Sequence, residues 1–368
     1  MRGADRQTAA MFSYLSPETL VPENHPLRAI RPLVNAALER LSGNFHRIYS
    51  AFGRDSIAPE KLLRALLLQA FFSVRSERQL MEQLTYNMMF RWFVGLSMDA
   101  PVWDVTVFTK NRERLLRGDV ARAFLAAILV DPKVEPLLSD EHFSVDGTLI
   151  EAWASMKSFK PKDGSGEPPA PGRNGEADFR GKPRSNETHA STTDLDARLY
   201  KKAAGQAAKL CHMGHVLTEN RNGLVVEAEL TLATGTAERE AACAMVDELE
   251  DEHRITVGAD KAYDTKDFVS TVRELNVTPH VTRNDKGRSS NLDRRTTRQP
   301  GYAISLSRRW LIEKGFGWLK QTGPLRQVKL RGLEKVDWLF VFSCAAHNLI
   351  RLPKLIAQPP ARLREQCA

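Results

Sequence analysis

The sequence predicts a mixed α and β protein in which an all-helical N-terminal domain precedes a domain built on a mixed sheet. Two patterns support this prediction. Up to about residue 130, apolar residues recur every three or four positions, as on one face of a helix. From Glu141 onward apolar and polar residues alternate, as in a strand with one buried face. A chain of 368 residues is long enough for two such domains.

The helical domain is predicted over residues 1–135. Proline favours the first position of a helix, and Ser76 followed by Gln79 forms a capping-box pattern. Apolar spacing behind these signals predicts five helices, beginning near Pro26, Pro59, Ser76, Val105 and Asp119.

The second domain is predicted over residues 140–355. Asn222-Gly223 lies between two strand-like runs, a strong sign of a hairpin. The elements follow the order β, β, β, α, β, α, β, α, which matches the ribonuclease-H-like fold with a mixed five-stranded sheet and flanking helices. Strands are expected at 142–150, 210–218, 224–233, 254–260 and 277–282, with helices after Thr236, after a cap at Asp264, and over 304–321.

Three segments are predicted to lie outside this framework. Residues 157–188 hold five prolines and five glycines, so residues 157–205 are interpreted as a flexible insertion. Residues 284–300 form a basic loop, and residues 356–368 form a tail.

Positive charge is concentrated in one region of the chain. Residues 283–331 contain 13 Lys and Arg but only three acids, a local charge of +10 against +8 for the whole chain. Such a density suits a polyanion, because each cation that neutralises a phosphate releases counterions. Nucleic acid is therefore the first partner to consider.

The sequence shows only weak signs of an export signal, of a membrane-spanning helix and of a zinc site. The first residues lack an apolar core behind their positive charge, and the apolar run 338–346 is short for a membrane span. The four cysteines form no CxxC pair, and Cys211, His212 and His215 fall on a strand whose neighbours face opposite ways. We expect a cytoplasmic protein that does not bind membranes.

Three acids occupy informative places in the predicted fold. Asp146 lies on the first strand, Asp260 ends the fourth, and Glu313 lies in the last helix. The first and fourth strands are neighbours in this fold, and the helix packs beside them, so the three carboxylates are expected to converge. Carboxylates that converge favour a divalent cation, and Mg²⁺ prefers oxygen ligands. Two such ions suit cleavage and transfer of phosphodiester bonds.

Several segments together resemble the DDE transposases of bacterial insertion sequences, most closely the insertion-sequence-five family. The three blocks that carry the resemblance are SVDGTLIEAWAS at 144–155, GADKAYDT at 258–265 and RRWLIEKGFGWLK at 308–320. Further segments extend it over most of the chain, namely PENHPLRAI at 22–30, SERQLMEQLTYNMMFRWFVGL at 76–96, HASTTDLDARLYKK at 189–202, GHVLTENRNGLVVEAELT at 214–231 and GTAERE at 235–240.

The resemblance implies a function and a set of site residues. Asp146, Asp260 and Glu313 would bind two Mg²⁺ or Mn²⁺ ions, with Arg309 and Lys320 as companions of the glutamate. The helical domain would recognise terminal inverted repeats, and the second domain would cut them and join them to target DNA. Because two ends are processed together, a homodimer or larger synaptic assembly is implied. The cations expected to hold DNA phosphates are Arg309, Lys320, Arg294, Arg295 and Arg298.

One position departs from the family pattern. Leu306 stands where the family usually has a tyrosine three residues before the arginine, and Tyr302 lies four residues further back. Two alternatives therefore stay open: a catalytically silent DNA-binding protein derived from a transposase, and a nuclease that cuts DNA without joining it.

Overall fold

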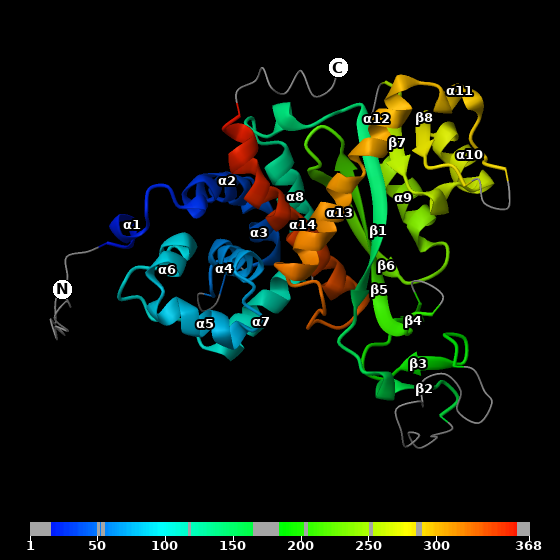
Figure 1. Cartoon of the computed structure of the whole chain (residues 1–368). Coiled ribbons are helices and arrows are strands. Elements are labelled where there is room, and N and C mark those ends of the chain that lie inside the picture. Colours follow the sequence, from blue (N-terminus) through cyan, green and yellow to red (C-terminus); the bar gives the residue numbers. More distant parts are fainter. Residues whose placement is uncertain are drawn as a thin grey trace, which may run out of the picture.

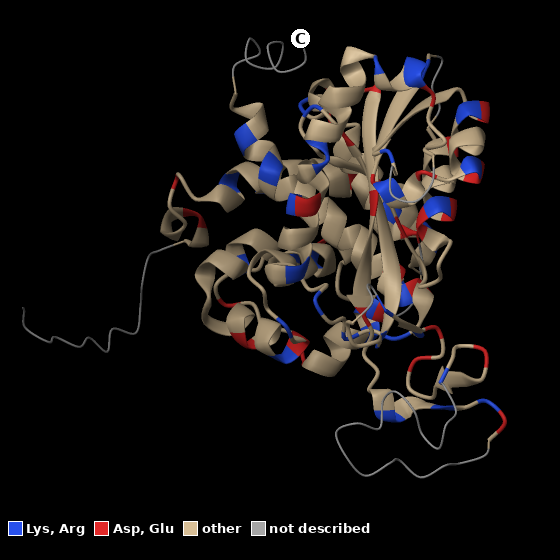
Figure 2. Ribbon diagram, turned by 45° about the vertical axis from the view of Figure 1, so that its right-hand side comes forward, with Lys and Arg blue, Asp and Glu red and all other residues tan. Residues whose placement is uncertain are grey.

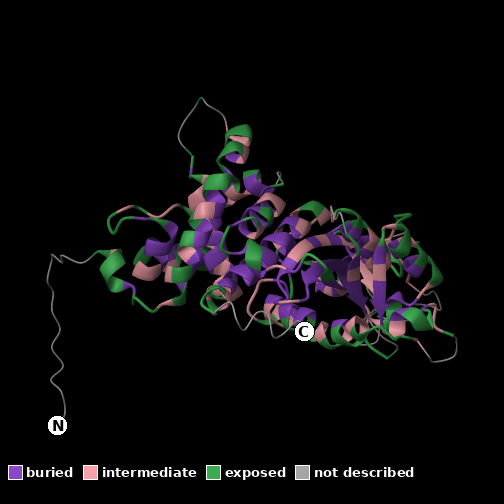
Figure 3. Ribbon diagram, turned by 90° about the horizontal axis from the view of Figure 1, so that it is seen from above, coloured by how far each residue is buried: buried purple, intermediate pink, exposed green. Residues whose placement is uncertain are grey.

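The computed structural model describes residues 16–49, 52, 56–116, 119–164, 184–201, 205–249, 253–284 and 289–358. The helical region lies beside a twisted sheet, and the long helix α14 (Leu333–Ile356) runs between them (Figure 1). Buried residues continue from the helical region through α14 into the sheet (Figure 3). The two predicted domains therefore share one core.

The helical region contains the five predicted helices and three shorter ones. The Ser76 hydroxyl accepts the N–H of Gln79, as the capping pattern predicts. The third predicted helix divides at Asn87, because the Asn87 side chain accepts the N–H of Phe90 and starts a new helix there. The helices are α1 (Pro17–Leu20), α2 (Pro26–Arg40), α3 (Ser42–Ile48), α4 (Pro59–Phe71), α5 (Glu77–Tyr86), α6 (Met88–Val94), α7 (Val105–Leu116) and α8 (Val120–Leu129), and the 3₁₀ turn η1 (Glu135–Leu137) follows them.

The sheet has the ribonuclease-H-like strand order that the sequence predicts. Its main path is β6–β5–β1–β7–β8, in which β6, β5 and β1 are antiparallel neighbours and β7 and β8 run parallel to β1. The short strand β4 (Arg198–Tyr200) also pairs with β5, so the sheet has six strands rather than five. The main strands are β1 (His142–Glu151), β5 (Lys209–Glu219), β6 (Val225–Leu232), β7 (Ile255–Ala259) and β8 (Val277–Val281).

Helices cover both faces of the sheet. On β1, Phe143 and Val145 point into the core beneath α9 (Ala237–Asp247) and α10 (Lys266–Glu274). Alternation along the strand turns Asp146 and Ile150 to the opposite face. That face is covered by α12 (Pro300–Arg308), α13 (Trp310–Gln321) and α14, which follow the 3₁₀ turn η3 (Lys261–Tyr263) and the short helix α11 (Arg294–Thr297) along the chain.

The predicted helix over 304–321 is two helices, which meet at Arg309. The first docks on β8, where His280 Nδ1 lies 2.7 Å from Ser305 Oγ and the Tyr302 hydroxyl donates to the Val281 carbonyl. The second packs against β1 and α14. Arg309 keeps helical backbone angles, φ −55° and ψ −28°, so the two helices follow each other without a loop.

The helix α14 is the part of the fold that the sequence analysis missed. It is long and apolar enough to cross a membrane, but 61% of its most apolar window is buried inside the protein. It packs against α2, α4, α8 and β6, and its Asn348 side chain bonds both the N–H and the carbonyl of Val225. The burial and the contacts are those of a core helix.

The predicted flexible insertion, residues 157–205, is partly ordered. After the turn η2 (Met156–Ser158), β2 (Phe159–Pro161) pairs with β3 (His189–Ser191), while residues 165–183 and 202–204 lie outside the described part. Fully buried Asp194 lies 3.2 Å from His212 Nε2 on β5 and accepts the N–H of Gly332. This carboxylate attaches the insertion to the sheet and to the start of α14.

Close contact between β5 and α14 leads to a prediction about stability. A Cβ on Gly214 of β5 would overlap the buried ring of Phe340, so Gly214→Ala should lower the free energy of unfolding by about 1–3 kcal/mol. Urea denaturation followed by circular dichroism measures this. Gly43→Ala on α3 is the control, because a Cβ there meets no atom within 4 Å. Equal midpoints for the two variants would contradict the packing.

Candidate active site

The register of β1 and β7 brings the first two acids together. The parallel pairs are His142 with Thr256, Phe143 with Val257, and Ser144 with Gly258. The ladder ends there: Asp146 lies two residues further along β1, and Asp260 directly follows β7. The charge of Asp260 acts on Asp146, so the two carboxylates lie near each other.

The joint between α12 and α13 brings the other two groups to the same face. Arg309 lies at the joint, and its Nη2 is 3.8 Å from Asp146 Oδ2. Glu313 lies one turn further along, in the first turn of α13, and is exposed. Because α12 is fastened to β8 and α13 to β1, the position of Arg309 follows from both contacts.

Electrostatics indicate that the three carboxylates lie near one another. Burial raises the pKa of Asp146 to about 6; the charges of Asp260 and Glu313 raise it further, whereas the N–H of Gly147 and the Arg309 guanidinium act against this rise. The Asp146 side chain is 21% exposed and that of Arg309 18%. The site is thus half-buried and contains three acids and one nearby cation, Arg309.

Asp264 has a different role from the predicted one. The helix cap of α10 is Thr265, whose hydroxyl accepts the N–H of Phe268. The fully buried Asp264 carboxylate instead accepts the N–H groups of Asn284 and Asn291, each at 2.8 Å. It fastens the loop that leads to α11. Asp264 is therefore a structural residue, and Asp260 is left as the acid of the site.

The remaining predicted cations lie further along the same helices. Lys320 is two turns beyond Glu313 on the same side of α13, about 10 Å along the axis, and its charge acts on Cys211 at the end of β5 nearest Glu151. Arg294, Arg295 and Arg298 are exposed at α11, separated from Arg309 by the length of α12, about 14 Å. The structure does not gather them at the acids. Lys and Arg occur on the helices around the sheet (Figure 2).

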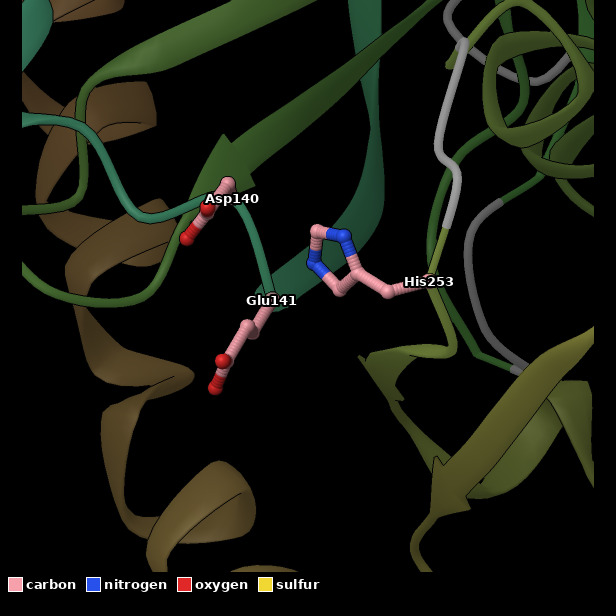
Figure 4. A group of neighbouring side chains, drawn as sticks. All are labelled: Asp140, Glu141 and His253. Atoms are coloured by element: carbon pink, nitrogen blue, oxygen red, sulfur yellow. The ribbon is translucent and has the colours of Figure 1, made fainter.

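A second group of possible metal ligands lies elsewhere. The ligand atoms of Asp140, Glu141 and His253 are within 4.8 Å of one another, and all three residues are exposed where β1 begins (Figure 4). Five residues of strand separate Glu141 from Asp146, about 16 Å. Within the described residues this is the one group that meets that distance, so the triad of Asp146, Asp260 and Glu313 is more widely spaced. Wider spacing is expected where carboxylates bind two ions that are themselves about 4 Å apart.

Two residues next to the site have no distinguishing signal in the sequence. Glu238, in the first turn of α9, lies against Gly147, and the buried hydroxyl of Tyr263 lies among the same charges. The GTAERE segment offered no reason to choose Glu238 over Glu240, because helix N-termini favour any acid. The aromatic ring of Tyr263 is enough to predict a position in the hydrophobic core, so the sequence gives no sign of a place next to the site.

The donor set fits a divalent cation. All the candidate ligand atoms are carboxylate oxygens, which Mg²⁺ and Mn²⁺ prefer. Three carboxylates near one guanidinium leave negative charge at the site, and this charge adds to the effect of burial, which is the main cause of the raised pKa of Asp146. Bound cations would neutralise that charge.

Fold and site together define the class: a ribonuclease-H-like protein with acids on two adjacent strands and on the helix that covers them. Residues 15–114 match the family model described as "Transposase domain (DUF772)". Residues 183–349 match the model described as "Transposase DDE domain", which includes Asp260 and Glu313 but begins after β1. The two models together match well over half of the chain, which belongs to the DDE transposases.

Two solved structures show a distant likeness. One is a cryo-EM structure of the piggyBac transposase synaptic complex with hairpin DNA, with 10% identity, 92% of this chain and 84% of that chain covered, and a TM-score of 0.39. The other is a pre-cleavage Mos1 transpososome, with 11% identity, 92% and 98% covered, and a TM-score of 0.20. Likeness at these TM-scores supports no argument about fold or partners. No curated protein matches the chain.

Crowding of the acids predicts a gain in stability when one is neutralised. Burial and two like charges disfavour ionised Asp146, so Asp146→Asn should raise the free energy of unfolding of the EDTA-treated protein at pH 7.5 by up to about 3 kcal/mol. Added Mn²⁺ should raise the melting temperature of the unsubstituted protein but not of the variant. Differential scanning calorimetry measures both. A lower melting temperature for the EDTA-treated variant would contradict this account of the site.

Docking of α12 predicts a dependence on pH. His280 is 1% exposed, and burial, with a smaller effect of the His142 charge, lowers its pKa to about 4. Below about pH 6.5 the unfolded chain binds a proton that folded His280 does not, so stability falls as the pH falls from 6.5 toward 4. His280→Asn, which can still bond Ser305, should reduce this loss by about 2 kcal/mol at pH 5. Parallel curves of unfolding free energy against pH for the two proteins would refute it.

Proposed function

We propose that this DDE transposase binds the terminal inverted repeats of an insertion sequence of the insertion-sequence-five family, cuts the DNA there and joins the ends to a target duplex. One observation supports the proposal: Arg309 Nη2 lies 3.8 Å from Asp146 Oδ2, and the charges of Asp260 and Glu313 act on the same carboxylate. That combination suits a phosphodiester, whose oxygens are anionic while its cleavage requires an activated hydroxyl.

Asp146, Asp260 and Glu313 are the proposed ligands of two Mg²⁺ or Mn²⁺ ions. Bound there, the ions would make a water or hydroxyl more acidic and neutralise charge on the phosphate. Arg309 contributes independently. Its Nε is buried without a partner among the described residues, and its Nη2 is only loosely paired with Asp146, so the guanidinium retains donors for a phosphate oxygen.

The wider distribution of cations supports a duplex that extends beyond the acids. Lys320 lies about 10 Å from Glu313 along α13, and the arginines of α11 lie about 14 Å from Arg309 in the other direction. DNA advances 3.4 Å per base pair, so these distances correspond to about three and four base pairs. In this proposal Arg309 and Lys320 bind phosphates near the cleaved bond, and Arg294, Arg295 and Arg298 bind the flanking duplex.

The helical region is the proposed reader of the terminal repeats. Its family match supports a role in transposition, and α14 connects it directly to the sheet. Because two DNA ends must be processed together, we propose a homodimer or larger synaptic assembly, which acts on the bacterial nucleoid in the cytoplasm.

A cleavage assay tests the proposal. With Mg²⁺ or Mn²⁺, the protein should cut DNA that carries a terminal repeat and should join the cut end to a target plasmid. Asp260→Asn should reduce both reactions at least about 100-fold, because the loss of a carboxylate ligand weakens ion binding and the reactions require the ions. DNA binding in a gel-shift assay should be unchanged, because the substitution removes no positive charge. Asp267→Asn, an exposed acid on α10, should behave like the unsubstituted protein.

Other outcomes of this assay would replace the proposal. Binding without cleavage would indicate a silent DNA-binding protein. Leu306 favours that alternative, because it provides no hydroxyl at the family's tyrosine position, and Tyr302 donates its own to Val281. Cleavage without a joined product would indicate a nuclease.

A further inference from the structure

A fourth acid lies against the strand that carries Asp146. The helix α9 begins after Thr236, and the Thr234 hydroxyl accepts the N–H of Ala237, which directs the first turn toward the sheet. There a Cβ built on Gly147 would lie 2.8 Å from both Cγ and Oε1 of Glu238. The Glu238 carboxylate therefore rests on the backbone of the residue next to Asp146, in space that only glycine leaves open.

The edge of β1 is open at this point. The ladder with β7 ends at Ser144, and the next described backbone pairing on that edge is the bridge from Glu151 to Gln327. Between them, Asp146 Oδ1 accepts the N–H of Gly147 at 2.8 Å. The charges of Glu238, Asp146 and Asp260 all act on the Tyr263 hydroxyl, so this acid of the α9 side lies near both aspartates.

The hydroxyl of Tyr263 lies in the same place without a partner. Tyr263 is fully buried, its ring packs edge-on against Phe268, and its hydroxyl makes no hydrogen bond within the described residues. Burial raises the pKa of Tyr263, and the charges of Glu238, Asp146 and Asp260 raise it further. A buried donor without an acceptor is costly, so a group held between these acids is expected to receive its hydrogen bond.

We propose that Glu238 is a fourth acidic residue of the cation site, contributing an oxygen ligand from the α9 side of Asp146 and Asp260. The inference rests on the proposed function in one respect, namely that the site binds divalent cations. Mg²⁺ and Mn²⁺ sites hold six oxygens, and three carboxylates leave positions to fill. Glu238 fills one of them, and the Tyr263 hydroxyl donates to an oxygen held there.

The helix dipole alone does not account for Glu238. Acids are common in the first turn of a helix, and Glu240 of the same turn is exposed, as expected for that role. Glu238 instead points at the strand, and its charge acts on the buried Tyr263 hydroxyl together with the charges of Asp146 and Asp260. Glu240 is therefore the matched control.

Isothermal titration of the full chain with MnCl₂, without DNA, tests the inference. Glu238→Gln should weaken Mn²⁺ binding at least tenfold, whereas Glu240→Gln should leave the affinity unchanged.

A second variant displaces Glu238 without removing any carboxylate. The methyl group of Gly147→Ala would force Glu238 away, so this variant should weaken Mn²⁺ binding as Glu238→Gln does. Combining the two substitutions should add nothing further, because both act on one interaction. Circular dichroism confirms that each variant is folded before titration.

Failure of this inference and failure of the proposed function give different results. If the unsubstituted protein binds Mn²⁺ and Glu238→Gln binds it equally well, Glu238 is not a ligand and the proposed function stands. If the unsubstituted protein binds no Mn²⁺ at millimolar concentration, the cation site itself is wrong, and this inference is wrong with it.

Discussion

The parallel ladder between β1 and β7 is the interaction on which the site depends. Three backbone pairs fix the offset between the strands, and Asp146 and Asp260 each follow this ladder by two residues. A slip of one residue would turn one aspartate to the opposite face, since side chains alternate along a strand. Antiparallel pairing with β5 along most of β1 opposes such a slip. The positions of the two proposed ligands thus depend on backbone hydrogen bonds rather than on the acids, whose charges repel one another.

Packing then adds the helical groups. The contacts of His280 and Tyr302 fasten α12 to β8, so the chain arrives at Arg309 in one orientation. Asp264 holds the loop before α11 by its backbone. None of these residues reaches the acids. They determine where Arg309 and Glu313 lie. A site built from three distant segments therefore depends on structural residues outside it.

Much of this arrangement could be predicted from the sequence, for identifiable reasons. Alternation predicts β1, and the position of Asp260 after a short apolar run predicts a strand end, so the order of elements predicts that these two acids lie near each other. Asp264 was misassigned because a short acid before a helix resembles a cap, and only the fold shows that its partners are backbone groups twenty or more residues away. The helix break at Arg309 has no local signal, because neither proline nor glycine stands near it in the sequence. Glu238 could not be distinguished from Glu240 without knowing which one faces Gly147.

The helix α14 contributes to two cores at once, with the helical region on one side and β6 on the other. If the helical region binds a duplex as proposed, α14 would relate that duplex directly to the acids, because the helix packs against both parts. A conformational change that makes room for a second duplex would then involve peripheral parts, such as the two-stranded sheet of β2 and β3, which extends from the body of the protein (Figure 1).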